Sequence, residues 1–268
     1  MNRYESTFAR LKKNREMAFI PFAVAGDTDI NTSESVFKTY IDAGADILEI
    51  GYPFSDPVAD GPVNQRAAQR SIAAGLDHKK FFELISSIRK YGDTPIGVLM
   101  YANSAFHLGY KNFCKRAADA GIDSILVADM PPEEAPEMLE AMRKNGLNTV
   151  FIVSELTPPK RVRYICDAVS GFVYVVSRLG TTGVQTNMDI NVKTTLTKLK
   201  KITGKPLCVG FGISTPNHVA QVKHAGADGA IVGSALVDII EKNADDKKTI
   251  LKLLSKSVSM YKKATLDL

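Results

Sequence analysis

The chain has 268 residues, of which 45% are hydrophobic and 24% charged, and its formal net charge at pH 7 is +5. A chain of this length can bury a large core without disulfides or structural metals, and no apolar run approaches the roughly 18 residues of a membrane-spanning helix. The positive charge lies on helical patterns without interleaved aromatic residues, which argues against a nucleic-acid partner.

The cysteines and the N-terminal segment indicate the compartment. Cys114, Cys166 and Cys208 are scattered and odd in number, and their spacing is typical of neither a metal site nor a disulfide framework. Segment 1–19 is amphipathic rather than apolar, unlike a secretory signal. These features predict a protein of the reducing cytoplasm.

A helical pattern at 2–14 opens the chain, and an apolar run at 19–26 follows it as the first expected strand. From there a unit recurs along the chain: an amphipathic helical pattern, a glycine, a short apolar run and a polar loop. The apolar runs do not alternate with polar residues, which is typical of parallel strands buried on both faces. The eight expected strands lie within 19–26, 42–51, 96–101, 119–129, 144–153, 172–177, 206–212 and 224–234.

Helical patterns lie between most of these strands. Gly44, Gly121, Gly146 and Gly226 stand where such helices would end, at the position that needs a left-handed backbone. The expected helices are 30–43, 78–91, 110–120, 131–145, 158–168, 191–203, 216–225 and 245–264.

Eight strands alternating with helices predict a closed (β/α)₈ barrel that forms a single domain over residues 1–268, with an extra N-terminal helix and a short helix before the last barrel helix. An open, doubly wound parallel sheet is the alternative. No GxGxxG motif follows the first strand, which weakens a dinucleotide-binding interpretation of that alternative. In a barrel, the residues at the carboxyl ends of the strands are the candidates for an active site.

Two acidic residues fall at such a strand end. Glu49 stands inside an apolar strand, where an ionised carboxylate is costly and is usually paired, shifted in pKa or functional. The loop at 51–62 is long for a βα connection and contains Asp56 and Asp60, both of which could simply be turn residues. From the residues alone, Glu49 is unusual and the role of Asp60 stays open.

The segment LEIGYPFSDPVADG (48–61) resembles the most characteristic segment of the tryptophan synthase alpha subunit family. The match continues through Pro62 and Gln65, and the other matching segments come in the family's order and spacing, so that the resemblance covers nearly the whole chain. These segments are RYESTFARLK (3–12), PFAVAGD (21–27), LMYAN (99–103), LVADMP (126–131), SRLGTTG (177–183), GFGIS (210–214) and GSA (233–235).

The resemblance implies that Glu49 and Asp60 are the catalytic pair in the reversible retro-aldol cleavage of indole-3-glycerol phosphate to indole and glyceraldehyde 3-phosphate. It implies that Glu49 shuttles a proton and that Asp60 supports the indole nitrogen as an anion. The sequence independently disfavours two other routes, because no expected strand carries a Schiff-base lysine and the four histidines form no metal-ligand set. We therefore expect no cofactor and no metal on this chain.

The substrate's phosphate is expected at the ends of the seventh and eighth strands. The glycine-bearing segments GFGIS (210–214) and VGSALVDII (232–240) would offer backbone N–H groups beside the start of a short helix, and Ser234 is expected to cap that helix and to donate to the phosphate. These glycines could also simply make tight turns. The resemblance implies that Gly183, Gly212, Gly233 and Ser234 are the phosphate ligands. It also implies that Thr182 holds Asp60 in place, in a loop that closes over the substrate.

An indole ring needs a flat apolar slot, and apolar residues near the strand ends are candidates for it. Each of them alone could equally be core filler. The resemblance places all of these candidates around the indole: Phe22, Leu99, Tyr101, Ala128, Ile152, Tyr174 and Phe211.

The resemblance further implies a partner, a beta chain that carries pyridoxal phosphate and takes up the indole, in an alpha2beta2 complex that completes tryptophan biosynthesis. Three alternatives remain open. One is a sugar-phosphate epimerase or isomerase with the same phosphate loops, against which the 48–61 segment argues. Another is a barrel that only binds a ligand or partner, against which Glu49, Asp60 and Thr182 argue. The third is an indole-releasing lyase that works without a beta chain.

Overall fold

The computed structural model describes residues 2–176, 188–210 and 212–266. Within these residues, nine parallel strands form one sheet in the order β5-β4-β3-β2-β1-β9-β8-β7-β6. Their bounds are β1 Ala18–Val24, β2 Leu48–Gly51, β3 Ile96–Met100, β4 Ser124–Val127, β5 Asn148–Thr149, β6 Phe151–Ser154, β7 Val173–Val176, β8 Leu207–Gly210 and β9 Gly229–Val232.

The two ends of this sheet are consecutive in the chain. β5 pairs with β4 and β6 pairs with β7, and Val150 joins them while donating its own N–H to the carbonyl of Ile125 at 3.3 Å. The two pieces are therefore halves of one strand that changes partner at Val150, and the sheet closes into an eight-stranded barrel. This confirms the expected (β/α)₈ fold.

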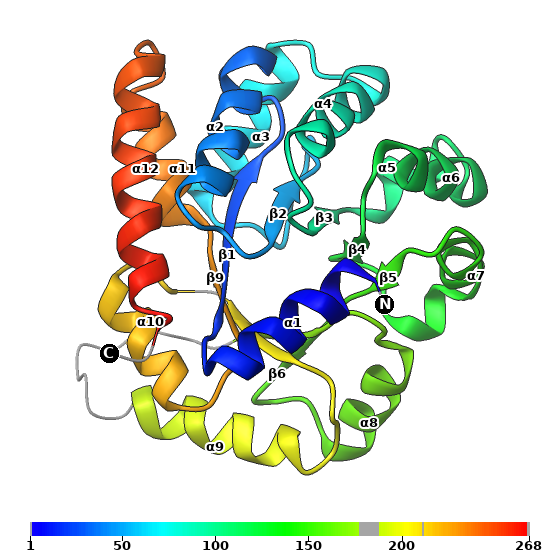
Figure 1. Cartoon of the computed structure of the whole chain (residues 1–268). Helices are drawn as coiled ribbons and strands as arrows, with labels where there is room; N and C mark the ends of the chain where they lie inside the picture. Colours follow the sequence, from blue (N-terminus) through cyan, green and yellow to red (C-terminus); the bar gives the residue numbers. More distant parts are fainter. Residues whose placement is uncertain (1, 177–187, 211, 267–268) are drawn as a thin grey trace.

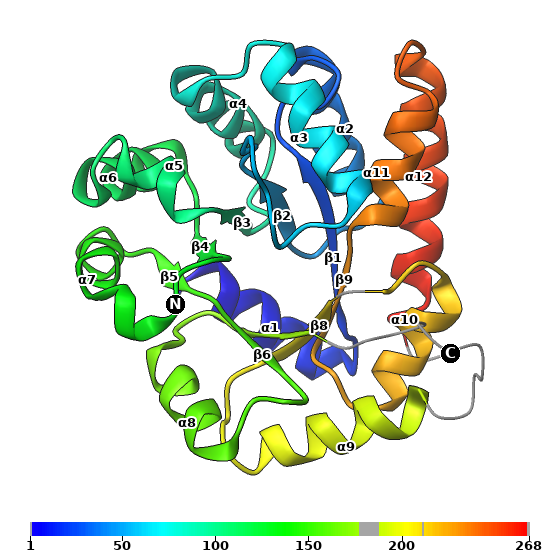
Figure 2. The same ribbon diagram turned by 180° about the vertical axis from the view of Figure 1, so that it is seen from behind.

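Helices surround the barrel (Figures 1 and 2), and they bury the outward-facing side chains of strands that are apolar on both faces. The helices are α1 Arg3–Asn14, α2 Ile30–Asp42, α3 Pro62–Ala73, α4 His78–Tyr91, α5 Ala102–Phe106, α6 Tyr110–Ala120, η1 Pro132–Glu134, α7 Pro136–Lys144, α8 Pro159–Ala168, α9 Met188–Lys200, α10 Pro216–His224, α11 Ser234–Lys242 and α12 Lys247–Lys263.

Four expected helix ends depend on glycine. Gly44, Gly121, Gly146 and Gly226 all have positive φ angles, as a left-handed turn into the following strand requires. At Gly121 a Cβ atom would also lie 2.6 Å from the side chain of Arg89, so a larger residue would be excluded there by contact as well as by backbone strain.

The structure corrects two expectations about helices. The helix expected over 131–145 is a short 3₁₀ turn, η1, followed by α7, which begins at Pro136. The connection after β2 is shorter than expected, because Pro62 starts α3 directly after the loop 52–61. Neither α3 nor α5 was predicted from the sequence.

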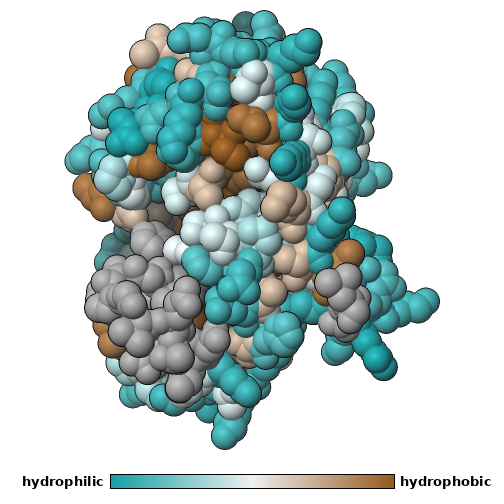
Figure 3. Space-filling model, turned by 90° about the vertical axis from the view of Figure 1, so that its left-hand side faces the viewer, coloured by the Kyte–Doolittle hydropathy of each residue, from teal (hydrophilic) through white to brown (hydrophobic). Residues whose placement is uncertain are grey.

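The N-terminal helix α1 lies across the amino ends of the strands, the end of the barrel that Figure 1 faces. Its side chains Tyr4 and Leu11 are only 2% and 1% exposed, so α1 closes this end. On the outside, hydrophilic side chains cover most of the face shown in Figure 3, and hydrophobic ones form small groups. In the described part of the chain, no helix has both the length and the apolar character needed to cross a membrane.

Candidate active site

A cavity of about 400 Å³ opens at the carboxyl ends of the strands. This volume lies in the range of small-molecule sites, and apolar side chains form most of its wall. Its lining residues are Phe22, Glu49, Ala59, Asp60, Gly61, Asn64, Leu99, Tyr101, Ala128, Ile152, Tyr174, Val176, Gly212, Ile213, Ile231, Gly233 and Ser234. Both predicted carboxylates thus line one cavity.

Glu49 lies in the middle of β2, in register with Phe22 on β1 and Gly97 on β3. It is only 6% exposed, and no hydrogen bond to its carboxyl group is found among the described residues. Burial raises the pKa of Glu49 to about 8, and the negative charge of Asp60 adds to the increase. At neutral pH the folded protein therefore holds Glu49 mainly as the neutral acid, ready to donate a proton.

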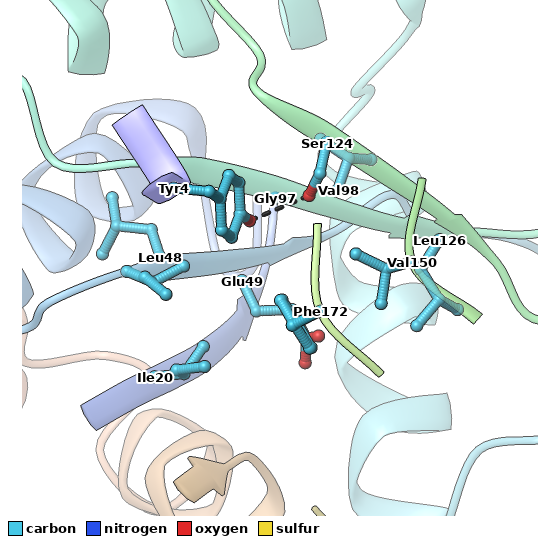
Figure 4. Close-up of a pocket in the computed structure, with 11 residues that line it drawn as sticks. Tyr4, Ile20, Leu48, Glu49, Gly97, Val98, Ser124, Leu126, Val150 and Phe172 are labelled. Atoms are coloured by element: carbon cyan, nitrogen blue, oxygen red, sulfur yellow. Dashed lines mark hydrogen bonds between the residues drawn. The ribbon is translucent and has the colours of Figure 1, made fainter. Parts of the chain in front are cut away.

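Below Glu49 the barrel interior is almost filled. A void of about 10 Å³ lies there, closed by the side chain of Tyr4 from α1 and lined by Glu49 itself. The Tyr4 hydroxyl and Ser124 Oγ are hydrogen-bonded at 2.8 Å, and in Figure 4 the Glu49 carboxyl group points away from this pair. Glu49 thus lies between the upper cavity and this small void, which the side chain of Tyr4 from α1 closes.

Asp60 is placed by the loop between β2 and α3. Its Oδ2 accepts a hydrogen bond of 2.9 Å from the hydroxyl of Tyr101, which in turn accepts one of 3.0 Å from the backbone N–H of Ala59. Partial burial raises the pKa of Asp60, while hydrogen bonds from Tyr101 and Asn64 act in the opposite direction. Because the charge of Asp60 contributes to the raised pKa of Glu49, Asp60 is the carboxylate that ionises first.

Two tyrosines frame the carboxylates. The ring of Tyr101 stacks on Phe54 with 5.2 Å between the ring centroids, which fixes the hydroxyl that binds Asp60. Tyr174 is 8% exposed and lies over Gly210, where any Cβ atom would clash with the phenol. Burial raises the pKa of Tyr174, as do the charges of Glu49 and Asp60, so the phenol stays protonated beside the pair.

The opposite end of the cavity is built from backbone groups. Gly212 has a φ of +78°, which favours glycine, and Gly233 is the N-cap of α11. Ser234 is the first residue of α11 and makes no cap hydrogen bond, so the expectation that it caps the helix is wrong. None of the described lining residues is a lysine or arginine; the free N–H groups at the start of α11 supply the positive potential here.

Eleven of the fourteen predicted site residues line the cavity. The other three, Thr182, Gly183 and Phe211, lie outside the described residues. Two lining residues that were not predicted, Val176 and Ile231, lie two positions from the predicted residues Tyr174 and Gly233. Alternate residues of a strand face the same side, so this spacing could have predicted both. The remaining unpredicted lining residues are Ala59, Gly61, Asn64 and Ile213.

The fold and the site define a (β/α)₈-barrel enzyme with a buried acid and a hydrogen-bonded carboxylate in one largely apolar cavity. The family model described as "Tryptophan synthase alpha chain" matches residues 8–266. The chain therefore belongs to the tryptophan synthase alpha chain family, and it is a carbon–carbon lyase.

Individual relatives and solved structures support the same family assignment. The chain is 44% identical over 264 residues to the tryptophan synthase alpha chain of Methanoregula boonei, covering 98% of each chain. Its structure is similar to tryptophan synthase subunit alpha from Legionella pneumophila, with a TM-score of 0.91, 34% identity and coverage of 99% and 98%. A structure of tryptophan synthase from M. tuberculosis in the aminoacrylate-bound form is similar at a TM-score of 0.88, with 26% identity and coverage of 99% and 100%.

Proposed function

We propose that Glu49 and Asp60 perform the acid–base steps by which this chain cleaves indole-3-glycerol phosphate to indole and glyceraldehyde 3-phosphate. The observation that carries the proposal is the contrast between the two carboxyl groups in one cavity: Glu49 has a pKa of about 8, and Asp60 ionises first. A neutral acid beside an anion is the arrangement that protonation of an electron-rich ring requires.

Cleavage requires one proton transfer to the ring and one from the side-chain hydroxyl. Glu49 gives its proton to C3 of the indole ring, and the ring nitrogen takes up the resulting positive charge while its N–H donates to the Asp60 carboxylate. The Glu49 carboxylate then removes the proton of the adjacent side-chain hydroxyl. As the aldehyde forms, the carbon–carbon bond breaks and its electron pair returns to the ring, which leaves indole, glyceraldehyde 3-phosphate and a reprotonated Glu49.

The shape of the cavity supports this substrate. The apolar walls around the carboxylates, including Phe22, Leu99 and Ile152, suit a flat aromatic ring. The glycine-rich end at Gly212 and Gly233 and the start of α11 suit a phosphate, which binds well to backbone N–H groups at a helix N-terminus. The cavity therefore offers a place for each half of indole-3-glycerol phosphate.

A beta chain is the partner that we propose, in an alpha2beta2 complex in the cytoplasm. Exposed apolar side chains on the segments that follow β2, β3 and β6 support a protein contact at this end of the barrel: Val58 is 73% exposed, Phe106 66% and Leu156 76%. The described strands of this chain contain no lysine that could bind pyridoxal phosphate, so this cofactor would be held by the beta chain.

The proposal is tested by incubating the purified chain with indole-3-glycerol phosphate and measuring both products. We expect equal amounts of indole and glyceraldehyde 3-phosphate, formed slowly by the isolated chain and faster when a beta chain from a relative is added. Failure to form indole even with the beta chain would refute the activity. Equal rates with and without the beta chain would refute the coupling while leaving the activity intact.

A further inference from the structure

A cluster of four charged side chains joins α3, α11 and the loop after β1. Arg70 on α3 donates to both carboxylate oxygens of Asp27 in this loop, with N···O distances of 2.7 and 3.0 Å. The same guanidinium group donates to Glu241 on α11 at 2.8 Å. Arg66, one turn earlier on α3, donates to both carboxylate oxygens of Glu241 at 2.7 Å. Within this ion-pair cluster, Arg70 is therefore the side chain that bonds to both of the other elements.

Both helices of the ion-pair cluster begin at the cavity. The helix α3 starts directly after Gly61, and Gly61 and Asn64 line the cavity together with Asp60. The helix α11 starts at Ser234, which lines the other end of the cavity together with Gly233. The distance from Asp60 to the start of α11 thus depends on how the two helices lie against each other.

Apolar packing between α3 and α11 involves small side chains. The buried face of α3 consists of Ala67, Ala68 and Ser71, and Ala67 belongs to a small buried cluster with Val237 of α11. Small side chains interlock less than long ones do, so they hold two helices less firmly in one position. Hydrogen bonds between arginine and a carboxylate are directional and match in few orientations. The ion-pair cluster is therefore the contact that best defines the position of α3 relative to α11.

The ion-pair cluster influences the cavity through position and not through its charge. Its two guanidinium groups and two carboxylates have formal charges that cancel, and none of the four side chains lines the cavity. The side chain of Asp27 is 2% exposed and that of Arg70 24%, so solvent screens this pair less than a surface ion pair. Loss of Arg70 would also leave the buried carboxylate of Asp27 without its ionic partner.

We propose that Arg70 is a positioning residue that, together with Glu241, fixes the distance between Asp60 and the phosphate end of the cavity. The inference rests on the proposed function, in which one substrate spans both ends. The indole half would meet Asp60, and the phosphate half would meet the start of α11. A shift of α3 against α11 would leave each half of the site intact but would separate the halves wrongly for the joined substrate. A misplacement of about 1 Å can lower a rate by about 10²-fold.

The test uses the variants Arg70→Met and Glu241→Met, and the second keeps the ion pair between Arg70 and Asp27. Affinities are measured in a Glu49→Gln background, which should bind the substrate without cleaving it. Because the chain contains no tryptophan, indole fluorescence reports the binding of indole and of indole-3-glycerol phosphate, and calorimetry reports the binding of glycerol 3-phosphate. We expect both variants to bind the joined substrate about tenfold more weakly and each separate half less than about twofold more weakly. In the chain with Glu49 intact, kcat/KM should fall by about 10²-fold.

Arg66→Met is the matched control, because Arg66 contacts Glu241 but not Asp27 and its side chain is 51% exposed. An exposed ion pair contributes little, so this variant should stay within about twofold of the parent chain in every measurement. Unchanged affinity for the joined substrate in Glu241→Met would overturn the inference. An equal loss in Arg66→Met, or separate halves that lose as much affinity as the joined substrate, would overturn it as well.

The separation of the helices can also be measured without substrate. Spin labels at Gln69→Cys on α3 and Lys242→Cys on α11 would occupy exposed positions, whereas the three native cysteines are buried. The distance distribution between the labels should shift or broaden in Arg70→Met and Glu241→Met and stay unchanged in Arg66→Met. An unchanged distribution in the first two variants would refute the positioning role. If the wild type failed to cleave indole-3-glycerol phosphate, the proposed function would be refuted, and the label distances would still decide whether Arg70 positions the helices.

Discussion

Glu49→Gln is expected to lower kcat for cleavage of indole-3-glycerol phosphate by about 10²–10⁴-fold, the usual contribution of a general acid–base group. Glutamine has nearly the shape of the protonated Glu49 that the buried site favours, but its amide cannot donate a proton to carbon or remove one from the hydroxyl. Because glutamine is uncharged, like the protonated Glu49 that it replaces, the binding of the substrate should change little. The measurement is a steady-state assay of indole release, with substrate binding followed separately by calorimetry.

The same variant should also differ from the wild type in how its free energy of unfolding depends on pH. The pKa of Glu49 is raised by folding, from an ordinary 4.5 to about 8, so its contribution to stability is fully present below 4.5 and is lost as the pH rises to about 8. Glutamine does not titrate. The stability of Glu49→Gln relative to the wild type should therefore increase between these pH values, by about 1.4 kcal/mol for each unit of raised pKa at most.

Two results would contradict this account of Glu49. Near-normal kcat in Glu49→Gln would show that another group transfers the proton. A difference in unfolding free energy that stays constant from pH 4.5 to 8 would show that Glu49 has an ordinary pKa in the folded protein. Urea unfolding at a series of pH values gives the second measurement independently of the first.

Asp60→Asn is expected to reduce kcat by about 10²-fold or more, because a neutral amide cannot stabilise the positively charged ring as a carboxylate does. The substitution has a second effect at a distance. The charge of Asp60 contributes to the raised pKa of Glu49, so its removal should lower that pKa and move the alkaline limb of the rate profile to lower pH. A loss of rate and a moved alkaline limb should therefore appear together in this variant.

Asp56→Asn, measured on the isolated chain, is the matched control for Asp60→Asn. Asp56 belongs to the same loop, is exposed and does not line the cavity. Its replacement should leave both the rate and the alkaline limb as in the wild type. If Asp60→Asn kept full activity, or if Asp56→Asn lost as much activity as Asp60→Asn, the proposed role of Asp60 would be wrong.

The recurring helix–glycine–strand unit was enough to predict the barrel. The bounds expected for α4 and α6, 78–91 and 110–120, agree with the structure to the residue, because strong apolar stripes and clear end signals define these helices. The helix α3 was missed because Gly61 gives no side-chain cap signal and the buried face of the helix consists of the small residues Ala67, Ala68 and Ser71. A stripe of small residues is a weak hydrophobic signal.

Missing α3 also hid part of the site. Because Pro62 starts a helix, Asn64 lies on the first turn of α3 and lines the cavity with Asp60. If residues 62–73 are taken as a loop, the sequence does not indicate which way the side chain of Asn64 faces. The start of α11 was also misjudged by one residue. Ser234 was expected to be the N-cap, but β9 ends at Val232 and Gly233 is the N-cap of α11. The pairing of Glu49 with Asp60 was available from the resemblance, but the raised pKa of Glu49 depends on the apolar layer that three-dimensional packing builds around it.

The most direct test of the central claim is the pH dependence of kcat/KM for cleavage by the wild type. If Glu49 must begin the reaction as the neutral acid, activity should fall as the pH rises through about 8. A profile that instead increased through this range would show that the reaction begins with ionised Glu49, and it would contradict the proposed pairing of a neutral acid with the Asp60 anion.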